Sequence, residues 1–281
     1  MNNKVIQLFF SIIQHVILLL VAFIATIPIV SCVLTSFKTQ DSIYNNSFFS
    51  FSKEMFTLEN YKTIFNSGYF KALLLTLLIV LISVFISTLL NAMTAYVLCR
   101  FEFKTKRFVY MLILFASFIP SLTMQVYIFK MMATLNLVNN LFGYVFMVSG
   151  IDIVSITIFS RYFNSIPHSI EETALIEGCS YQKIFFKIHL PLLKQAFLTA
   201  AIIRTIYIYN EYYLANLYLL DKSKYSTVTT LLYSFSAPFG TQYNIICAGV
   251  ILAAIPTILV FLIFQKKIYN GLMSTTKIQF E

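Results

Sequence analysis

The chain has 281 residues, of which 59% are hydrophobic and only 11% are charged, and its formal net charge is +9. Soluble globular domains carry about 25% charged residues, so the composition excludes that class. The basic residues lie between long apolar runs, so membrane topology explains the positive charge better than nucleic-acid binding does. Several runs exceed the roughly 20 residues that cross a bilayer, which favours helices over the alternating strands of a β-barrel.

Six apolar segments predict an all-α polytopic membrane protein with six transmembrane helices. In chain order they cover about 8–36, 71–98, 108–130, 139–162, 196–219 and 243–265. Each has 23 or more residues, enough to span a bilayer with some tilt. The first is too long for the apolar core of a signal peptide and is interpreted as a span. Pro28, Pro120 and Pro256 lie within spans, and proline usually bends such a helix. We expect residues 1–281 to form a single transmembrane domain.

The distribution of Lys and Arg predicts the orientation. With six spans both termini lie on one side, which holds twelve basic residues against seven on the other. Four of the twelve lie in the short connection 99–107. The positive-inside rule therefore places both termini, this connection and the loop 163–195 in the cytoplasm.

Two outer segments, 37–70 and 220–242, are longer than plain connectors. Residues 56–61 of the first predict a short helix that is capped by Thr57 or by a residue before it. The second contains an apolar patch at 228–235, which is too short to span. This patch is expected to dip back into the protein or to line the outer mouth of a cavity.

The loop 163–195 begins with a charged, helix-forming segment. Ser169 and Glu172 form a capping-box pattern at its start. Glu171 and Glu172 lie in the first turn, where the helix dipole favours negative charge. Gly178 is expected to end this helix in a left-handed conformation or to allow a close turn.

A second helix is predicted to follow, with Ser180 as its cap. Its apolar face has the spacing i, i+3, i+4, i+7 and comprises Tyr181, Ile184, Phe185 and Ile188. Pro191 marks the end of this helix or a kink into the fifth span.

The spacing of the loop is Glu172-Thr173-Ala174, three residues, Gly178, nine residues, then Ile188-His189-Leu190-Pro191. It resembles the EAA loop of ABC importer permeases, Glu-Ala-Ala, three residues, Gly, nine residues, Ile-x-Leu-Pro, with Thr173 as the one departure. Weaker matches over nearly the whole chain resemble the carbohydrate-uptake branch, and the closest type is the smaller six-span subunit of maltose-like and multiple-sugar permeases. They lie at 56–61, 95–101, 119–120, 135–139, 210–211, 255–256, 264–267 and 271–272.

The resemblance implies a type I ABC importer permease fold with a cytoplasmic coupling helix between spans four and five. This helix would dock in a groove of an ATPase, with Glu172 paired to a basic residue there, and ATP-driven closure would rock the permease between outward- and inward-facing states. The implied ATPase-coupling residues are Glu171, Glu172, Thr173, Ala174, Gly178, Leu190 and Pro191.

The resemblance also implies the partners. They are a second homologous permease subunit, a cytoplasmic ATPase dimer that binds ATP and Mg, and an extracellular solute-binding protein that delivers a sugar. The expected location is the plasma membrane of a bacterium, in contact with lipid and not with nucleic acid.

The chain contains no phosphate-binding loop, no G-x-S-x-G nucleophile elbow and no cluster of metal ligands. We therefore expect a non-catalytic subunit that binds no cofactor and leaves ATP to a partner. The cysteines are far apart, lack metal-ligand spacing and are interpreted as small apolar fillers. They are Cys32, Cys99, Cys179 and Cys247.

Three charged residues, Asp152, Arg204 and Glu211, fall within the apolar spans, where such groups usually face the bundle interior or a wet cavity. Arg204 and Glu211 lie on nearly the same helix face, with Tyr207 between them and Asn210 adjoining. Aromatic faces and polar groups suit a sugar, so Asn210, Glu211, Tyr207 and Asp152 are candidates for a cavity or substrate site. Alternatively, Asp152 and Arg204 form an interhelical pair, Glu211 lies near the outer interface, and the tyrosines belong to an interfacial belt.

Other functions stay open at this point. One alternative is a permease of the same kind with a different cargo, such as a polyamine or glycerol phosphate. An ion-coupled secondary transporter predicts inverted repeats and interrupted helices, and no convincing repeat relates 1–140 to 141–281. A membrane-embedded enzyme is disfavoured because no catalytic constellation is present.

Overall fold

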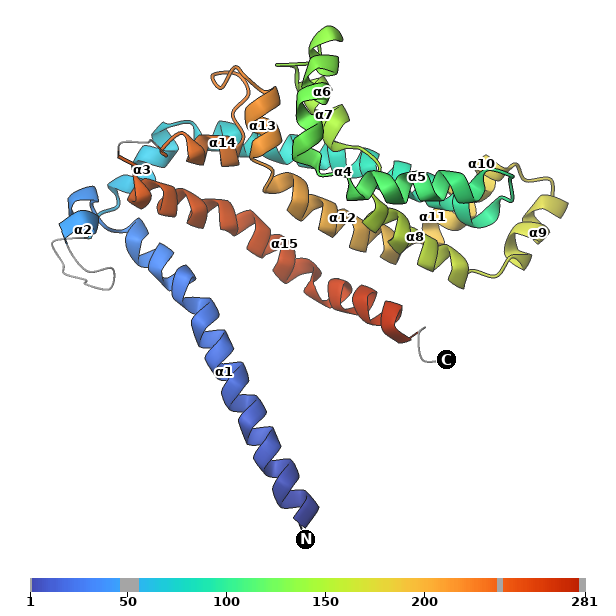
Figure 1. The fold of residues 1–281 in the computed structure, drawn as a ribbon, viewed down its shortest axis with the longest axis horizontal. Helices are drawn as coiled ribbons and strands as arrows, with labels where there is room; N and C mark the ends of the chain where they lie inside the picture. Colours follow the sequence, from blue (N-terminus) through green and yellow to red (C-terminus); the bar gives the residue numbers. More distant parts are fainter. Residues whose placement is uncertain (1, 46–55, 237–239, 278–281) are drawn as a thin grey trace. The chain divides into compact units, whose positions relative to one another are not determined.

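The computed structural model describes residues 2–45, 56–236 and 240–277. Within these ranges the secondary structure is helical, apart from an isolated backbone bridge between Lys38 and Phe56. The chain forms two compact units, one comprising residues 1–70 and 231–256, the other residues 71–230 and 257–281. Figure 1 shows the helices in sequence colours.

Three helices in the described part of the chain are each long and apolar enough to cross a membrane. The qualifying stretches are Phe9–Ser36, Tyr69–Arg100 and Tyr243–Gln265. They belong to α1 (Asn2–Ser36), α4 (Tyr69–Arg100) and α15 (Tyr243–Lys277). The number rises to six if each pair of helices joined by a sharp bend counts as one span. Pro28 and Pro256 lie inside α1 and α15, which stay continuous.

The bent pairs lie in the second unit. They are α5 (Lys106–Phe118) with α6 (Ser121–Thr134), α7 (Leu141–Val148) with α8 (Ile153–Ser165), and the segment Tyr181–Leu192 with α12 (Lys194–Tyr209). The first pair breaks at Pro120, which confirms the expected bend there. The third bends by 79° and begins earlier than the predicted fifth span at 196–219. That predicted span contains α12 and α13 (Tyr213–Tyr218) and is interrupted at 210–212.

The first unit is organised around the short helix α3 (Glu59–Asn66), which the sequence predicts. The residue that caps this helix is Leu58, without a side-chain cap, so the predicted cap at Thr57 or before it is wrong. The side chain of Thr57 still accepts a hydrogen bond from the amide of Glu59, 3.1 Å away. The buried Asn60 amide donates to the carbonyls of Ser36 and Lys38 at 2.8 and 2.9 Å. These hydrogen bonds attach α3 to the C-terminal end of α1. The short α2 (Gln40–Asn45) follows α1 in the chain.

The second unit has two hydrophobic cores. One joins α4, α6, α7, α12 and α13, and it comprises Ile79, Val80, Met132, Tyr144, Val145, Val148, Ile208, Tyr209, Ala215, Tyr218 and Leu219. The other joins α4, α8, the loop 163–195 and α12, and it comprises Ala92, Ala95, Tyr96, Leu98, Ile156, Phe159, Phe163, Phe185, Leu193, Ala196 and Ala200. The second core anchors the charged loop to the helical bundle.

The apolar patch at 228–235 contains α14 (Val228–Tyr233), a helix too short to span. The amide of Val228 donates to the hydroxyl of Thr76 on α4, 3.0 Å away. The patch therefore packs at its start against a long helix of the second unit.

Candidate functional site

The charged loop folds into α9 (Ser169–Ile176), α10 (Tyr181–Ile184), a π-helical turn η2 (Phe185–His189) and α11 (Leu190–Leu192). The capping box predicted from Ser169 and Glu172 is wrong. His168 precedes the helix with helical backbone angles and no side-chain cap, and the first-turn amides donate to its carbonyl. Ser169 is therefore the first residue of the helix rather than its cap.

Gly178 ends α9 as expected, with a φ of 75°. Its amide donates to the carbonyl of Leu175 and the amide of Cys179 donates to the carbonyl of Ala174, at 3.0 and 2.9 Å. This pair of bonds is the Schellman arrangement, which favours glycine because other side chains strain at positive φ. No atom beyond its chain neighbours lies within 4 Å of the position a Cβ would take, so backbone conformation alone restricts this site.

The next turn also follows the sequence pattern. The Ser180 hydroxyl accepts from the amide of Lys183, which confirms the cap. Of the predicted apolar face, Ile184 and Phe185 are buried and Ile188 is half-buried, whereas Tyr181 is exposed. The chain bends at Leu193, just after Pro191, before α12 begins.

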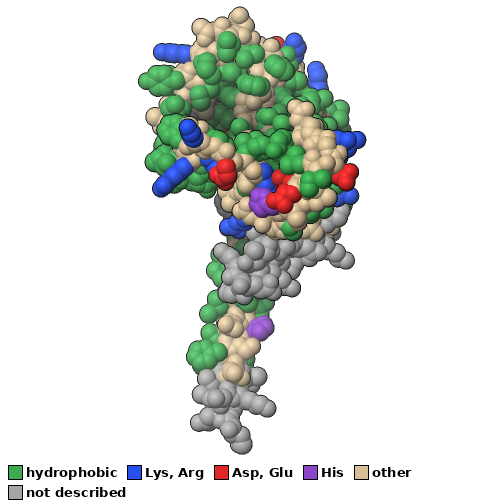
Figure 2. Space-filling view, turned by 90° about the vertical axis from the view of Figure 1, so that its right-hand side faces the viewer, with side chains coloured by type: hydrophobic (Ala, Val, Ile, Leu, Met, Phe, Trp, Pro, Cys, Tyr) green, Lys and Arg blue, Asp and Glu red, His purple; other side chains and the backbone are tan. Residues whose placement is uncertain are grey.

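The seven predicted coupling residues divide into exposed and enclosed groups. Glu172, Thr173, Gly178 and Pro191 are exposed, Leu190 is half-buried, and Glu171 and Ala174 are buried. Thr173, the departure from the EAA pattern, donates its hydroxyl to the carbonyl of Ser169 at 2.8 Å and so stays satisfied within the helix. Ile176 at the end of α9 is 85% exposed. Figure 2 views the end of the molecule where α9 lies and shows acidic, basic and histidine side chains on that face.

Glu171 is buried against the rest of the loop, and the coupling role that the family resemblance implies for it stays a prediction. Its Oε1 lies 2.7 Å from Arg100 Nε and 2.6 Å from His189 Nε2. The side chains of Arg100 and Glu171 are 2% and 9% exposed, and that of His189 is fully buried. Sequence reasoning missed Arg100 and His189 as partners. Arg100 had a signal, because it is a cation at the end of a long apolar run.

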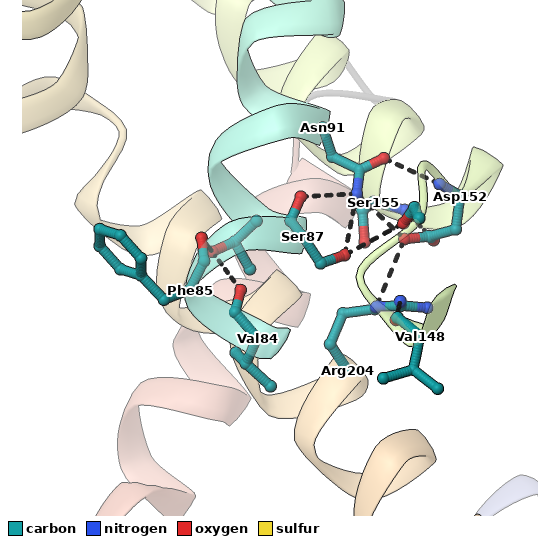
Figure 3. Close-up of polar contacts among 10 residues, drawn as sticks. Val84, Phe85, Ser87, Asn91, Val148, Asp152, Ser155 and Arg204 are labelled. Atoms are coloured by element: carbon teal, nitrogen blue, oxygen red, sulfur yellow. Dashed lines mark hydrogen bonds and ion pairs between the residues drawn. The ribbon is translucent and has the colours of Figure 1, made fainter. Parts of the chain in front are cut away.

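A second polar cluster lies where α7 and α8 meet at a 52° bend (Figure 3). The bend frees backbone groups that a continuous helix would pair, and side chains of other helices satisfy them. Arg204 of α12 donates to the carbonyl of Val148 at 2.6 Å, and Ser87 of α4 donates to that of Gly150 at 3.3 Å. The Asp152 carboxylate accepts from the amide of Ser155 at 2.8 Å and so caps α8.

Asp152 and Arg204 form the interhelical pair that the sequence left as an alternative, with Oδ2 and Nε 3.7 Å apart. A role for Asp152 in a cavity stays a prediction. The structure gives its carboxylate three protein partners, which are Arg204, Asn91 and the amide of Ser155.

The other candidates lie at the interruption after α12. Tyr207 is exposed, and its ring lies beneath the Arg204 guanidinium at 5.5 Å, so these two residues share a face of α12. Glu211 lies beyond the end of α12, in the interruption at 210–212, and so is not part of that helix. Glu211 is half-buried and accepts from the amide of Leu214, in the first turn of α13, at 2.9 Å. Asn210 is exposed and donates to the carbonyl of Ile206 at 2.8 Å. A contact with substrate stays a prediction for all three.

Comparison with known proteins connects these features to a family. Residues 87–272 match the family model described as binding-protein-dependent transport system inner membrane component. Among solved structures, a bacterial ABC transporter that imports the acidic polysaccharide alginate has a chain with a TM-score of 0.79 at 21% identity, covering 92% of this chain and 96% of that one. This likeness shows the fold.

Three curated relatives match this chain over most of their own length. The arabinooligosaccharides transport system permease protein AraQ of Halalkalibacterium halodurans is 28% identical, covering 90% of this chain and 91% of the relative. A probable permease for starch degradation products from Thermoanaerobacterium thermosulfurigenes, AmyC, is 30% identical, with 88% and 89% covered. The diacetylchitobiose uptake permease NgcG of Streptomyces coelicolor is 27% identical, with 95% and 89% covered.

Proposed function

Because this chain belongs to the family of binding-protein-dependent transport system inner membrane components, we propose that it is the permease subunit of an ATP-driven importer for oligosaccharides. The observation that carries the proposal is the family match, together with curated relatives named for transport of arabinooligosaccharides, starch degradation products and diacetylchitobiose. The interrupted helices that an ion-coupled transporter predicts are present, but they occur here in a chain that belongs to a binding-protein-dependent family.

The proposed complex contains this chain, a second homologous permease, two ATPase subunits that bind ATP and Mg²⁺, and an extracellular binding protein. A structural relative supports the last partner, because it is an alginate transporter in complex with a periplasmic protein that holds an alginate pentasaccharide. Both termini and the loop 163–195 face the cytoplasm in this proposal, as the distribution of basic residues predicts.

The α9 segment is the proposed contact with the ATPase. Glu172 and Ile176 are exposed on it, one offering charge and the other apolar area. Glu172→Lys reverses the charge at the proposed ion pair and should weaken retention of the ATPase during purification by about tenfold, since close interfacial charge pairs couple strongly. Gly178→Pro cannot adopt the observed positive φ and should have a comparable effect.

The class of molecule that is transported can be identified from what the cognate extracellular binding protein binds. Calorimetry against linear oligosaccharides, polyamines and glycerol phosphate decides between the cargo classes, and uptake into proteoliposomes of the complete complex confirms transport. Saturable ATP-dependent uptake of an oligosaccharide supports the proposal. Binding of a polyamine alone would overturn the sugar assignment, and uptake that needs an ion gradient without ATP would overturn the importer assignment.

We also propose that Tyr207, Asn210 and Glu211 lie near the translocation path, because the helix is interrupted at 210–212, directly at this group of polar side chains. Glu211→Ala removes the hydrogen bond to the amide of Leu214 in α13, so Asn210→Ala is the cleaner variant. The side-chain amide of Asn210 donates to the carbonyl of Ile206, only four residues earlier in the chain. A raised KM for sugar import at unchanged complex assembly supports the placement, and unchanged import kinetics contradict it.

A further inference from the structure

The two acidic residues in the first turn of α9 have opposite environments. Glu172 is exposed, whereas Glu171 is buried and contacts Arg100 and His189 through a single carboxylate oxygen. Successive residues on a helix point about 100° apart, so the burial of one and the exposure of the other follow from the same helix orientation. α9 thus has an exposed outer face that includes Glu172, and an inner face on which Glu171 is paired with Arg100 and His189.

Arg100 is the centre of the inner contacts. It is the last residue of α4, and its Nη2 donates to the carbonyls of Phe163 and Ile166 at 2.9 and 2.7 Å, at the C-terminal end of α8. A cation is favoured there because the last carbonyls of a helix lack intrahelical partners. The same guanidinium holds Glu171 through Nε and lies 3.0 Å from His168 through Nη1. One side chain therefore joins the ends of α4, α8 and α9.

His189 adds the fourth element. It ends η2, directly before α11 and the bend into α12, and its Nε2 reaches the same oxygen of Glu171. Its ring packs between Tyr96 of α4 and Phe163 of α8, with both ring centroids 5.3 Å away. The carboxylate of Glu171 is thus enclosed between a guanidinium and an imidazole that are themselves held by the bundle.

Removing one partner from such a cluster leaves a buried charge without compensation, which is far more costly than replacing both partners together. A helix held in this way moves with the elements that hold it. The other buried residue of α9 is Ala174, whose small side chain offers little contact area.

We propose that Glu171 is a positioning residue, which through Arg100 and His189 locks α9 to the ends of α4, α8 and η2, so that a displacement of α9 moves these helices as one body. The inference rests on the proposed function, in which Glu172 contacts the ATPase at the surface of α9. Glu171 would then transmit the resulting motion of α9 to the helices inside the bundle. This role differs from direct docking, because the carboxylate of Glu171 does not need to touch the ATPase.

The lock itself is tested by amide hydrogen exchange across residues 171–176 of the full chain in lipid nanodiscs. Glu171→Gln is expected to speed exchange there by about tenfold or more, because local opening becomes easier. Glu177→Gln is the matched control, with the same chemical change at an exposed position at the end of the same helix. His189→Phe removes one of the two partners and should give a smaller increase. Exchange equal to wild type in Glu171→Gln overturns the inference, and this readout does not depend on what the complex transports.

The coupling role is tested with the complete complex in proteoliposomes, by the ratio of ATP hydrolysed to sugar imported. Glu171→Gln should raise this ratio about fivefold or more while the ATPase subunits remain bound, and the double variant Glu171→Gln/Arg100→Gln should be less impaired than the sum of its single variants. Additive effects, or an unchanged ratio, overturn the coupling role. Absence of uptake by the wild-type complex would instead count against the proposed function and leave the exchange result standing.

Discussion

Asn91 and Asp152 bind each other twice across the junction of α4 and α8. The amide N–H of Asp152 donates to Asn91 Oδ1 at 2.9 Å, and Asn91 Nδ2 donates to Asp152 Oδ2 at 3.3 Å. Asn91 is fully buried and Nδ2 also donates to the carbonyl of Ser87 at 2.7 Å. A side-chain amide has both the donor and the acceptor that this junction needs, which a carboxylate or an apolar side chain lacks.

Asn91→Asp should therefore destabilise the protein despite its nearly identical shape. The change removes two donors and places a carboxylate beside that of Asp152, and the expected loss in free energy of unfolding is about 1–3 kcal/mol. Thermal unfolding of the purified chain in detergent measures it. Asn164→Asp, an exposed position on α8, is the control, and equal midpoints for the two variants would contradict the prediction.

Because Asp152 and Arg204 form an ion pair, the stability losses of their single variants should not add in the double variant. Arg204 is mostly buried and also holds the carbonyl of Val148, so Arg204→Met should cost about 1–3 kcal/mol, less than for a fully buried pair. Adding Asp152→Asn should recover part of that loss. Arg161→Met, at an exposed position on α8, controls for the loss of an arginine. Strictly additive losses would show that the two side chains do not interact.

Two glycines of the second unit should respond differently to alanine. A Cβ on Gly143 would collide with the backbone carbonyl of Leu137, whereas one on Gly150 would lie 3.6 Å from the nearest atom, an ordinary contact. Gly143→Ala is expected to cost about 1–3 kcal/mol, as overpacking of a well-packed site does, and Gly150→Ala should be tolerated. Expression level and melting midpoint of the two variants provide the measurement, and a reversed order would argue against the close packing of α7 on residue 137.

The stability of the first unit should also depend strongly on the buried side chain of Asn60. Besides its two bonds to the end of α1, its Oδ1 accepts from Asn244 Nδ2 at 2.7 Å, which links segments 184 residues apart. Asn60→Asp loses both donated bonds and should lower the melting midpoint strongly, since unsatisfied buried groups cost about 1–3 kcal/mol each. Asn66→Asp on the same helix is exposed and should melt like wild type.

Cys32 and Cys247 should be joined by mild oxidation. Cys32 Sγ donates to the carbonyl of Cys247, 3.8 Å away, which brings the two cysteines together. Copper phenanthroline is therefore expected to form an intrachain disulfide that peptide mass spectrometry detects, and Cys32→Ser should abolish it. A crosslink involving Cys99 or Cys179 instead would contradict the packing of α1 against α15.

Local chemistry made several elements predictable. The helix at 59–66, the bend at Pro120, the cap at Ser180 and the left-handed Gly178 each depend on residues within a few positions of one another. The capping box at Ser169 failed although its pattern was local, because the helix continues back to His168 and leaves the Ser169 amide in the first turn. The cysteines were interpreted as isolated fillers, and nothing in a separation of 215 residues indicated that Cys32 and Cys247 meet.

The sequence by itself determined the membrane class of this protein, its long apolar helices and the turns of the loop 163–195, because the length of an apolar run and the chemistry of a turn depend on short stretches of chain. Only the tertiary structure decided which of two adjacent glutamates faces outward. Glu171 and Glu172 have the same chemistry and nearly the same position, and they differ because Arg100 and His189 approach one side of the helix from 71 residues before and 18 residues after Glu171. The energy of a buried charge depends on such distant partners, which no local pattern records.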